Sequence, residues 1–547
     1  MARIDDVKSG ADHVEAISDE VHAHLRVAAE EELGKGQSVW KVLIQNPRAF
    51  SVVVVVLATA ILQGAELSMS GSMLGSQAFC KVMGAWDETS QAYVVAAGHV
   101  SAWNAGATPS QFFGYYMAGI LSDRYGRKMV IIGSMGLIVI GAIIETESIN
   151  WKIWLLSKVV MGIATGSIMA SSATYVAEVS PRELRGGCLI GYQFFTNLGN
   201  LVAAIALDLS AKTWSDPSNP LQWKIPLYIM IALPVVMSAA AFVMLVESPS
   251  WLVIKNRLPD AMKSLQWIYP WMTTDDLELE LAKLQYTVDK ERMENEANRG
   301  ESWLACLQGS NLRRTGVAMI PALAWVLAGN VVLILSAYFF SLAGESNALQ
   351  STVIVQCTGI AVNLFAAILV ENQRIGRWLI LVVGLFIQTG GMFMIGAVGA
   401  RWGSTIAGNA VAGNLVIAGV VISNIGCQLG PQAVSFLYAS ESGSSRLRAK
   451  TTSISMSIGS LVGQCTSILF PFILEDWGTQ VGFFFGGFGA LFLIICLVWV
   501  PDYTGRSHAQ IDELYARKIP ARKFASTDCT GNYGSNVLHD EVSATEP

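Results

Sequence analysis

Long apolar runs dominate the chain, and their length restricts the possible fold more than any other feature. About twelve runs have the roughly 20 apolar residues that a helix needs to cross a bilayer. Only 14% of the 547 residues are charged, and the mean hydropathy is +0.45. A soluble chain has about a quarter of its residues charged. The sequence therefore predicts an all-α membrane protein with spans near 49–70, 98–121, 129–146, 153–177, 187–208, 225–246, 315–341, 350–370, 378–399, 410–439, 450–473 and 478–500.

One polar stretch between two apolar runs marks a tight turn on the inner face of the membrane. The stretch is Gly119-Ile-Leu-Ser-Asp-Arg-Tyr-Gly-Arg-Lys128. Gly126 permits the reversal of the backbone, and Arg127 and Lys128 resist passage through the membrane. A weaker copy, Glu371-Asn-Gln-Arg-Ile-Gly-Arg-Trp378, lies between two later runs. The two copies predict two related halves of six helices each.

The polar segments divide the chain into five parts. Asp275–Arg299, inside the insert between the halves, is dense in charge and typical of a solvated helix. This insert is either a simple linker or a set of helices that braces the halves. Arg and Lys gather in the loops on the side of the first turn, which places both termini in the cytoplasm. The predicted parts are a tail (1–48), a first half (49–246), a cytoplasmic helical linker (247–314), a second half (315–500) and a second tail (501–547).

Composition and motifs argue against several other classes of protein. No basic domain suggests nucleic acid as a partner. The nucleotide-binding pattern G-x-x-x-x-G-K-S/T is absent, so we expect an ion gradient rather than ATP to supply energy. No metal-binding or nucleophilic cluster surrounds any histidine. The sequence therefore predicts neither an enzyme nor a bound cofactor, with an ion gradient as the driving force.

Further motifs stand at the ends of later spans. They are Tyr175-Val-Ala-Glu-Val-Ser-Pro-Arg-Glu-Leu-Arg-Gly186, Glu247-Ser-Pro-Ser-Trp-Leu252, Glu441 with Arg446-Leu-Arg-Ala-Lys450, and Pro501-Asp-Tyr-Thr-Gly-Arg-Ser507. Together with the first turn they resemble the motifs of the sugar porters of the major facilitator superfamily, in particular the fungal maltose and α-glucoside permeases. The resemblance covers most of residues 50–517. It implies alternating access between two six-helix halves, in a plasma-membrane protein that we expect to be a monomer.

Two ionisable residues inside predicted spans need a reason, because such a charge costs about 2.5 to 3.5 kcal/mol on insertion scales. Glu66 lies in the outer part of the first span and Lys158 lies in the fourth. The resemblance implies that they face each other and couple transport to protons. Such a pair can switch, because burial favours the neutral carboxyl and the cation favours the ionised one. In the alternative interpretation, Glu66 ends its span near water and Lys158 snorkels to the surface.

The substrate site is expected near the bilayer midplane, between the halves. In the fifth span, Gln193-Phe-Phe-Thr-Asn-Leu-Gly-Asn200 resembles the sugar-binding pattern Q-x-x-x-x-x-G-Q. Its two outer amides are two helical turns apart and share a face, although such amides also bond helix to helix. The resemblance implies a binding set made of Gln193, Asn197, Asn200, Trp325, Asn330 and Phe436.

The seventh span departs from the family pattern. Where Q-Q-x-x-G-x-N is usual, this chain has Trp325-Val-Leu-Ala-Gly-Asn-Val331. Trp325 can stack on a sugar ring, but fewer polar groups remain to bind hydroxyls. A less hydroxylated ligand therefore stays open as an alternative.

Charged residues at the inner ends of the helices form the last predicted set. In the resemblance they make a cytoplasmic gate, with Asp123, Arg127, Glu178 and Arg185 in the first half and Glu441, Arg446 and Arg448 in the second. We expect these ion pairs to latch the cytoplasmic ends in the outward-facing state and to break when the halves rock. Ordinary positive-inside anchors would explain the basic residues but not the regularly placed acids.

Taken together, the residues and the resemblance predict proton-coupled import of an α-glucoside or a related sugar. The expected partners are the sugar, protons and the lipid bilayer. Two alternatives remain: a transporter of another small metabolite, including an exporter, and a sugar sensor that does not transport.

Overall fold

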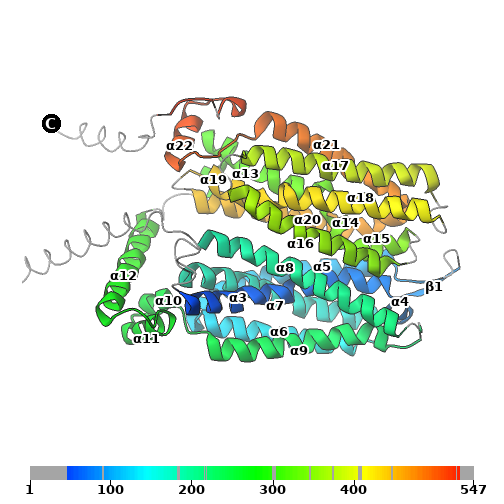
Figure 1. The fold of residues 1–547 in the computed structure, drawn as a ribbon, viewed down its shortest axis with the longest axis horizontal. Helices are drawn as coiled ribbons and strands as arrows, with labels where there is room; N and C mark the ends of the chain where they lie inside the picture. The colour runs from blue at the N-terminus through cyan, green and yellow to red at the C-terminus, as the bar shows by residue number, and fades with distance from the viewer. Residues whose placement is uncertain are drawn as a thin grey trace, which may run out of the picture.

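The computed structural model describes residues 46–88, 92–180, 185–214, 216, 218–297, 303–343, 347–371, 375–403, 409–444, 447–524 and 526–529. Long helices run side by side through the molecule, and the two halves of the chain form two adjacent groups (Figure 1). The all-helical prediction is confirmed, apart from a short hairpin of two antiparallel strands, β1 (Ala85–Asp87) and β2 (Ala92–Val94).

The elements of the first half precede the linker. They are α3 (Pro47–Ser72), η1 (Met73–Gly75), α4 (Gln77–Met83), α5 (Ala97–Tyr125), α6 (Arg127–Thr146), α7 (Trp151–Val179), α8 (Arg185–Thr213) and α9 (Leu221–Met244). Two of the ends have clear local causes. Pro47 stands in the first turn of α3, where its missing N–H costs nothing. The side chain of Asn150 accepts hydrogen bonds from the first backbone N–H groups of α7.

The linker and the second half follow. The linker contains α10 (Pro249–Ile254), α11 (Leu258–Ile268), α12 (Thr274–Ala297) and η3 (Trp303–Leu307). The second half contains α13 (Gly309–Trp325), η4 (Val326–Asn330), α14 (Val331–Ile334), α15 (Ser336–Leu342), α16 (Ala348–Glu371), α17 (Arg377–Trp402), α18 (Ala410–Leu429), α19 (Pro431–Ser442), α20 (Arg448–Trp477), η6 (Gly478–Gln480) and α21 (Val481–Trp499). After it come α22 (His508–Ala516) and η7 (Ala521–Lys523).

The number of spans fits the prediction. Ten stretches of the described residues are long and apolar enough to cross a membrane. One of them, Lys450–Trp499, holds both α20 and α21, joined by a turn at Gly478. The 29-residue α5 is long enough but more polar than the rest. With α20 and α21 counted separately and α5 added, the set agrees with the expected twelve spans.

Two predicted spans are not continuous helices. The seventh begins at Gly309 rather than 315, and after Trp325 it passes through a π-helical turn in which Gly329 has φ 105°. The tenth breaks between Leu429 and Pro431, because proline has no N–H to continue the helical ladder. Apolar length alone did not reveal either break.

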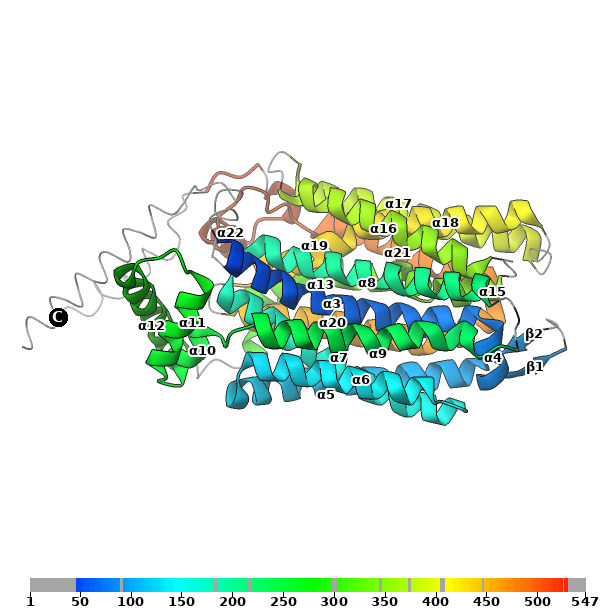
Figure 2. The same cartoon turned by 60° about the horizontal axis from the view of Figure 1, so that its bottom comes forward.

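The two ends of the bundle differ, as Figures 1 and 2 show. We call one the linker end, because α10, α11, α12 and α22 lie there together with the beginning of α3. The opposite one is the hairpin end, where α4, β1 and β2 lie. The start of α3 and the helix α22 thus lie at the same end, as an even number of spans requires.

The linker packs on the molecule as folded structure. Trp251 of α10 is buried, and its indole N–H donates to the carbonyl oxygen of Asp123 over 3.1 Å. Ser264 of α11 donates to the carbonyl oxygen of Glu247, while Thr315 of α13 donates to that of Cys306 in η3. The helical segments thus contact both halves, which favours the bracing interpretation of the insert.

The segment after the last span docks on the second half. Arg314 of α13 forms an ion pair with Asp512 of α22 and lies 4.5 Å from the centre of the Tyr515 ring. The hydroxyls of Tyr503 and Tyr515 are 2.5 Å apart. Burial raises the pKa of Tyr515 to about 12, so this hydroxyl stays protonated at neutral pH. These buried contacts hold α22 at the linker end.

Two glycines allow α3 and α8 to touch backbone to backbone. A Cβ atom at Gly64 would collide with the carbonyl oxygen of Thr196, and one at Gly199 with that of Ile61. Small residues at such crossings let helices pack closely in lipid, where van der Waals contact replaces the hydrophobic effect. This contact sets the position of α3, which carries Glu66.

We predict that Gly64→Ala destabilises the protein by about 1 to 3 kcal/mol, because α3 and α8 must move apart. Thermal unfolding of the purified protein in detergent measures the loss. Gly119→Ala in α5 is the matched control, since a Cβ atom there meets nothing within 4 Å. An unchanged melting temperature for Gly64→Ala would show that the helices adjust without cost.

Candidate functional site

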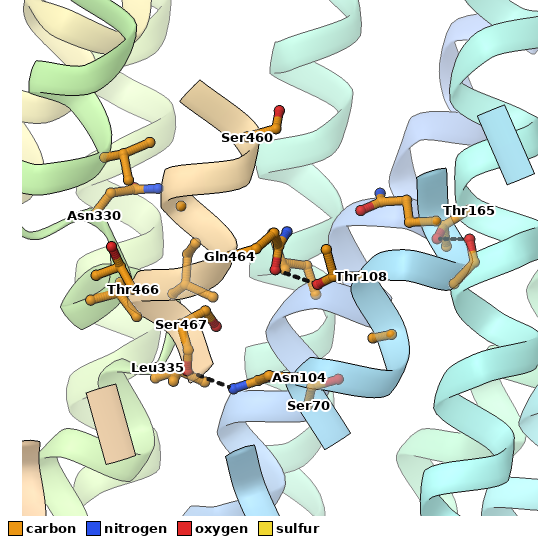
Figure 3. A pocket seen from close by; sticks show the side chains of 18 of the residues that line it. Ser70, Asn104, Thr108, Thr165, Asn330, Leu335, Ser460, Gln464, Thr466 and Ser467 are labelled. Atoms are coloured by element: carbon orange, nitrogen blue, oxygen red, sulfur yellow. Dashed lines mark hydrogen bonds between the residues drawn. The ribbon is translucent and has the colours of Figure 1, made fainter. Parts of the chain in front are cut away.

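A pocket of about 300 Å³ lies between the two halves of the bundle. Helices α3, α5 and α7 supply one wall, and α13, η4, α14 and α20 supply the other. The lining mixes apolar side chains with amides and hydroxyls, as a site for a small polar molecule requires. Its polar members are Gln63, Glu66, Ser70, Asn104, Thr108, Gln111, Lys158, Thr165, Asn330, Ser460, Gln464, Thr466 and Ser467. Figure 3 shows several of them.

Two facing helices give the pocket most of its amides and hydroxyls. Asn104, Thr108 and Gln111 recur along α5 at intervals of four and three residues, which places them on one face. Ser460, Gln464 and Ser467 repeat the same spacing on α20. The polar side chains that make α5 less hydrophobic than the other spans therefore face the pocket. This spacing was the signal in the sequence that would have identified the lining.

Hydrogen bonds between these two helices join the halves at the hairpin end of the pocket. Ser101 Oγ donates to the carbonyl oxygen of Ile468 over 2.7 Å, and Asn104 Nδ2 donates to that of Ser467 over 3.0 Å. Thr108 also bonds to Gln464 (Figure 3). These residues lie toward the start of α5 and the end of α20, so the bonds close the pocket on the hairpin side.

The structure brings Glu66 and Lys158 together at the pocket wall. Lys158 Nζ lies 2.6 Å from Glu66 Oε1, and Lys158 is 3% exposed. The interpretation in which Lys158 snorkels to the surface therefore does not describe this structure. Lys158 Nζ also lies 4.8 Å from the centre of the Trp154 ring, which adds a favourable contact for a cation. The coupling role of the pair remains a prediction.

A second carboxylate, absent from our prediction, binds the same ammonium group. Glu145 Oε1 of α6 lies 2.6 Å from Lys158 Nζ, and Glu145 is fully buried. In the sequence it stands at the end of the third span beside Glu147, where an acid is expected to face water. Only the packing of α6 on α7 distinguishes the buried Glu145 from the exposed Glu147.

The predicted substrate residues fall into two groups. Trp325 and Asn330 line the pocket at the break after α13. The fifth-span residues Gln193, Asn197 and Asn200 are not among the lining residues. Their binding role stays a prediction.

Interhelical contacts engage part of the fifth-span group. Asn197 Nδ2 donates to Gln428 Oε1 of α18 over 3.4 Å, and Gln193 Nε2 lies 3.5 Å from Asn197 Oδ1. This geometry agrees with the interpretation of these amides as links between helices. Phe436 of α19 also lies outside the lining, with 58% of its surface exposed.

At the linker end of the first half, Arg127 is the centre of an ion-pair cluster. Its guanidinium donates to Glu178 over 2.9 Å and lies 3.4 Å from Asp123. The backbone N–H of Arg127 donates to Glu247 Oε1 over 2.8 Å. A Cβ atom on Gly126, which has φ 96°, would collide with the Glu247 carboxylate. The side chain of Arg185 lies outside the described part of the structure.

The second half repeats this arrangement, with one correction to our prediction. Glu441 pairs with Arg377 rather than with Arg448, while Arg446 lies outside the described residues. Arg377 begins α17 directly after Gly376, as Arg127 begins α6 directly after Gly126. The two glycines hold the same position before these arginines but differ in conformation, with φ 96° at Gly126 and −62° at Gly376. The spacing near Glu441 did not reveal the pairing with Arg377.

A buried tyrosine beside each ion-pair cluster is a further feature that the two halves share. Tyr175 donates to the carbonyl oxygen of Val246 over 2.7 Å, and Tyr438 donates to that of Pro501 over 3.0 Å. Each tyrosine stands three residues before the acid of its cluster, Glu178 or Glu441. The ion pairs of Arg127 lie within the first half and that of Arg377 lies within the second, and their role as a latch stays a prediction.

Comparison with known proteins places this geometry in context. The family model described as "Sugar (and other) transporter" matches residues 52–515. The general alpha-glucoside permease of Saccharomyces cerevisiae is 27% identical over 517 residues, which cover 93% of this chain and 82% of the permease. The maltose permease MAL61 of Saccharomyces cerevisiae is 25% identical over 554 residues, covering 98% and 87% of the two chains.

Solved structures share the fold. The inward open conformation of the xylose transporter XylE from E. coli has a TM-score of 0.68 at 17% identity, covering 85% of this chain and 99% of that one. The proton:xylose symporter XylE bound to 6-bromo-6-deoxy-D-glucose, described as a major facilitator superfamily protein, has a TM-score of 0.64 at 18% identity and covers 86% and 100%.

Proposed function

Because this chain belongs to the sugar (and other) transporter family of the major facilitator superfamily, we propose that it carries a small sugar across the membrane together with a proton. The observation that carries this proposal is the Glu66–Lys158 pair on the wall of the pocket between the halves. A carboxylate there can exchange its proton with pocket water while the sugar is bound beside it. The proposed process moves the sugar across the membrane without making or breaking a covalent bond in it.

The proposed substrate is an α-glucoside or a related sugar. The α-glucoside and maltose permeases that resemble the chain along most of its length support this class. The amides and hydroxyls of α5 and α20 can bind sugar hydroxyls, and the Trp325 ring can stack on a sugar face. Asn197 on α8, a member of the predicted binding set, in contrast bonds to α18 and is not among the pocket residues. This observation favours a less hydroxylated metabolite as the second candidate.

We further propose that the linker end faces the cytoplasm of a plasma-membrane protein. The turn between α5 and α6, which carries the basic residues Arg124, Arg127 and Lys128, contacts the linker there, in agreement with the positive-inside rule. Because the hydrogen bonds between α5 and α20 close the hairpin side, this arrangement of the halves is the one that releases the sugar inside. Import then requires these bonds to break and the linker end to close.

Uptake of radiolabelled maltose and glucose tests the proposal, in yeast that lacks its own sugar transporters and expresses this chain. We expect accumulation at acidic pH that an uncoupler abolishes. A fluorescent tag establishes that the chain reaches the cell surface, and cells with an empty vector give the background. A surface-expressed chain that takes up neither sugar would contradict the sugar assignment. Uptake that ignores the uncoupler would contradict proton coupling.

A further inference from the structure

The ammonium group of Lys158 is shared by two buried carboxylates from different helices. Glu66 Oε1 of α3 and Glu145 Oε1 of α6 each lie 2.6 Å from its Nζ atom. Ser157 Oγ lies 3.5 Å from Glu145 Oε1. The second oxygen of each carboxylate, Oε2, is buried and has no hydrogen-bond partner. The cluster thus has two acids for one cation.

Two carboxylates beside one ammonium group favour a proton on one of the two acids. With both carboxylates ionised, the cluster would hold one uncompensated negative charge in the interior, which is expensive. Like charges on one site resist simultaneous ionisation. One proton makes the cluster neutral, and it occupies an oxygen that otherwise lacks a partner.

The surroundings differ between the two acids. Glu66 lines the central pocket, as Lys158 does, whereas Glu145 is 0% exposed and is not among the pocket residues. A proton can therefore reach Glu66 from pocket water more readily than it can reach Glu145. This difference in access makes Glu66 the acid that can exchange a proton with the pocket, while Glu145 has no contact with pocket water.

We propose that Glu145 is a positioning residue, a second buried carboxylate that shares Lys158 and thereby lets Glu66 take up and release a proton without leaving Lys158 unpaired. The inference rests on the proposed function, because it assigns Glu66 the coupling proton. When the proton adds to a Glu66 carboxylate oxygen, the Glu66 contact to Lys158 weakens. Lys158 then stays paired with Glu145 and is never left as a lone buried charge.

Titratable groups on the neighbouring helices are engaged elsewhere. His99 of α5 stacks on Trp151 at 4.4 Å, and Asp208 of α8 pairs with Lys212 at 2.7 Å. Lys224 of α9 lies 5.7 Å from the centre of the Trp223 ring. On α4, Cys80 contacts the Leu74 carbonyl oxygen and Lys81 contacts Ser218. The described ion pairs give the cluster no further charged member, so Glu145 is the group that modulates the Glu66–Lys158 pair.

The pH dependence of sugar uptake tests the inference. In Glu145→Gln, Glu66 is the one carboxylate of this cluster left beside Lys158. The ammonium group should therefore keep Glu66 ionised to lower pH. We expect Glu145→Gln to move the pH of half-maximal uptake down by about one to three units, as for a carboxyl that gains a full ionic partner. Glu147→Gln, at the exposed end of the same helix, is the matched control and should leave the profile in place. A Glu145→Gln profile that coincides with wild type overturns the proposal.

Infrared spectroscopy of the purified protein gives a readout that does not depend on transport. We expect a protonated-carboxyl band that titrates, is missing in Glu66→Gln and shifts to lower pH in Glu145→Gln. If the band disappears in Glu145→Gln instead, the proton belongs to Glu145 and the proposal is wrong. Absence of transport by wild type would contradict the proposed function, while this titration would still decide the role of Glu145.

Stability of combined variants provides a second test. Each single Gln variant leaves Lys158 one carboxylate, so we expect near-normal melting temperatures. Glu66→Gln/Glu145→Gln leaves the buried ammonium without a counter-ion, and its loss should greatly exceed the sum of the single losses. Adding Lys158→Met should restore most of the stability. Additive losses, or no rescue by Lys158→Met, would overturn the shared-cation arrangement.

Discussion

Glu66→Gln should abolish the accumulation of sugar while leaving its exchange across the membrane intact. One proton moving down 100 mV contributes about 2.3 kcal/mol, and one pH unit contributes about 1.4 kcal/mol more. Together they can sustain a gradient of roughly 500-fold by the relation between free energy and concentration ratio. Glutamine has nearly the shape of glutamate but no titratable proton, so the variant can only equilibrate the sugar.

Two uptake assays separate the parts of this prediction. Net accumulation in energised cells should fall to the external concentration, whereas counterflow of labelled sugar in preloaded cells should continue. Glu66→Asp, which keeps a carboxyl at the pocket wall, should retain part of the accumulation. If Glu66→Gln still concentrates sugar in an uncoupler-sensitive manner, the coupling proton lies on another residue.

The second large effect is expected at the linker end of the first half. Arg127→Met removes the buried guanidinium that binds Glu178 and the Ser122 carbonyl oxygen. Glu178, with 17% of its side chain exposed, then loses its ionic partner in a poorly solvated place. Breaking such a buried pair costs about 3 to 5 kcal/mol. We therefore expect a large fall in thermal stability and in the amount of protein at the surface.

Two comparisons identify the cause of that fall. Arg124→Met, three residues earlier, removes the same charge from an exposed side chain and should have little effect. Arg127→Met/Glu178→Met removes both charges and should recover much of the stability, because no unpaired ion remains. Equal losses in Arg127→Met and Arg124→Met would show that net positive charge, rather than the ion pair, is what this end requires.

The sequence was sufficient to predict the fold because apolar length and basic loops report on the membrane directly. The glycine turns at Gly126 and Gly376, recognised as copies of one motif, occupy equivalent places at the starts of α6 and α17. The breaks after Trp325 and at Pro431 were not anticipated, because composition averaged over a span does not report on a local turn.

The site was harder to predict than the fold, for a physical reason. A residue inside a bundle can face the pocket or a neighbouring helix. Residues within a single helical turn point in both directions, so the position of a span in the sequence does not tell them apart. Asn197 points to Gln428, whereas Asn104 lines the pocket, although both are amides inside predicted spans. Glu145 was missed because its burial depends on α7, which supplies Lys158. Pairwise packing decided each of these cases.

Proton movement driven by sugar tests the central claim most directly. Purified protein is reconstituted into vesicles that contain a pH-sensitive dye, and the sugar identified by uptake is added outside. We predict that sugar entry acidifies the interior in wild type and fails to do so in Glu66→Gln, although that variant still exchanges labelled sugar. Sugar entry into wild-type vesicles without any movement of protons would contradict the account.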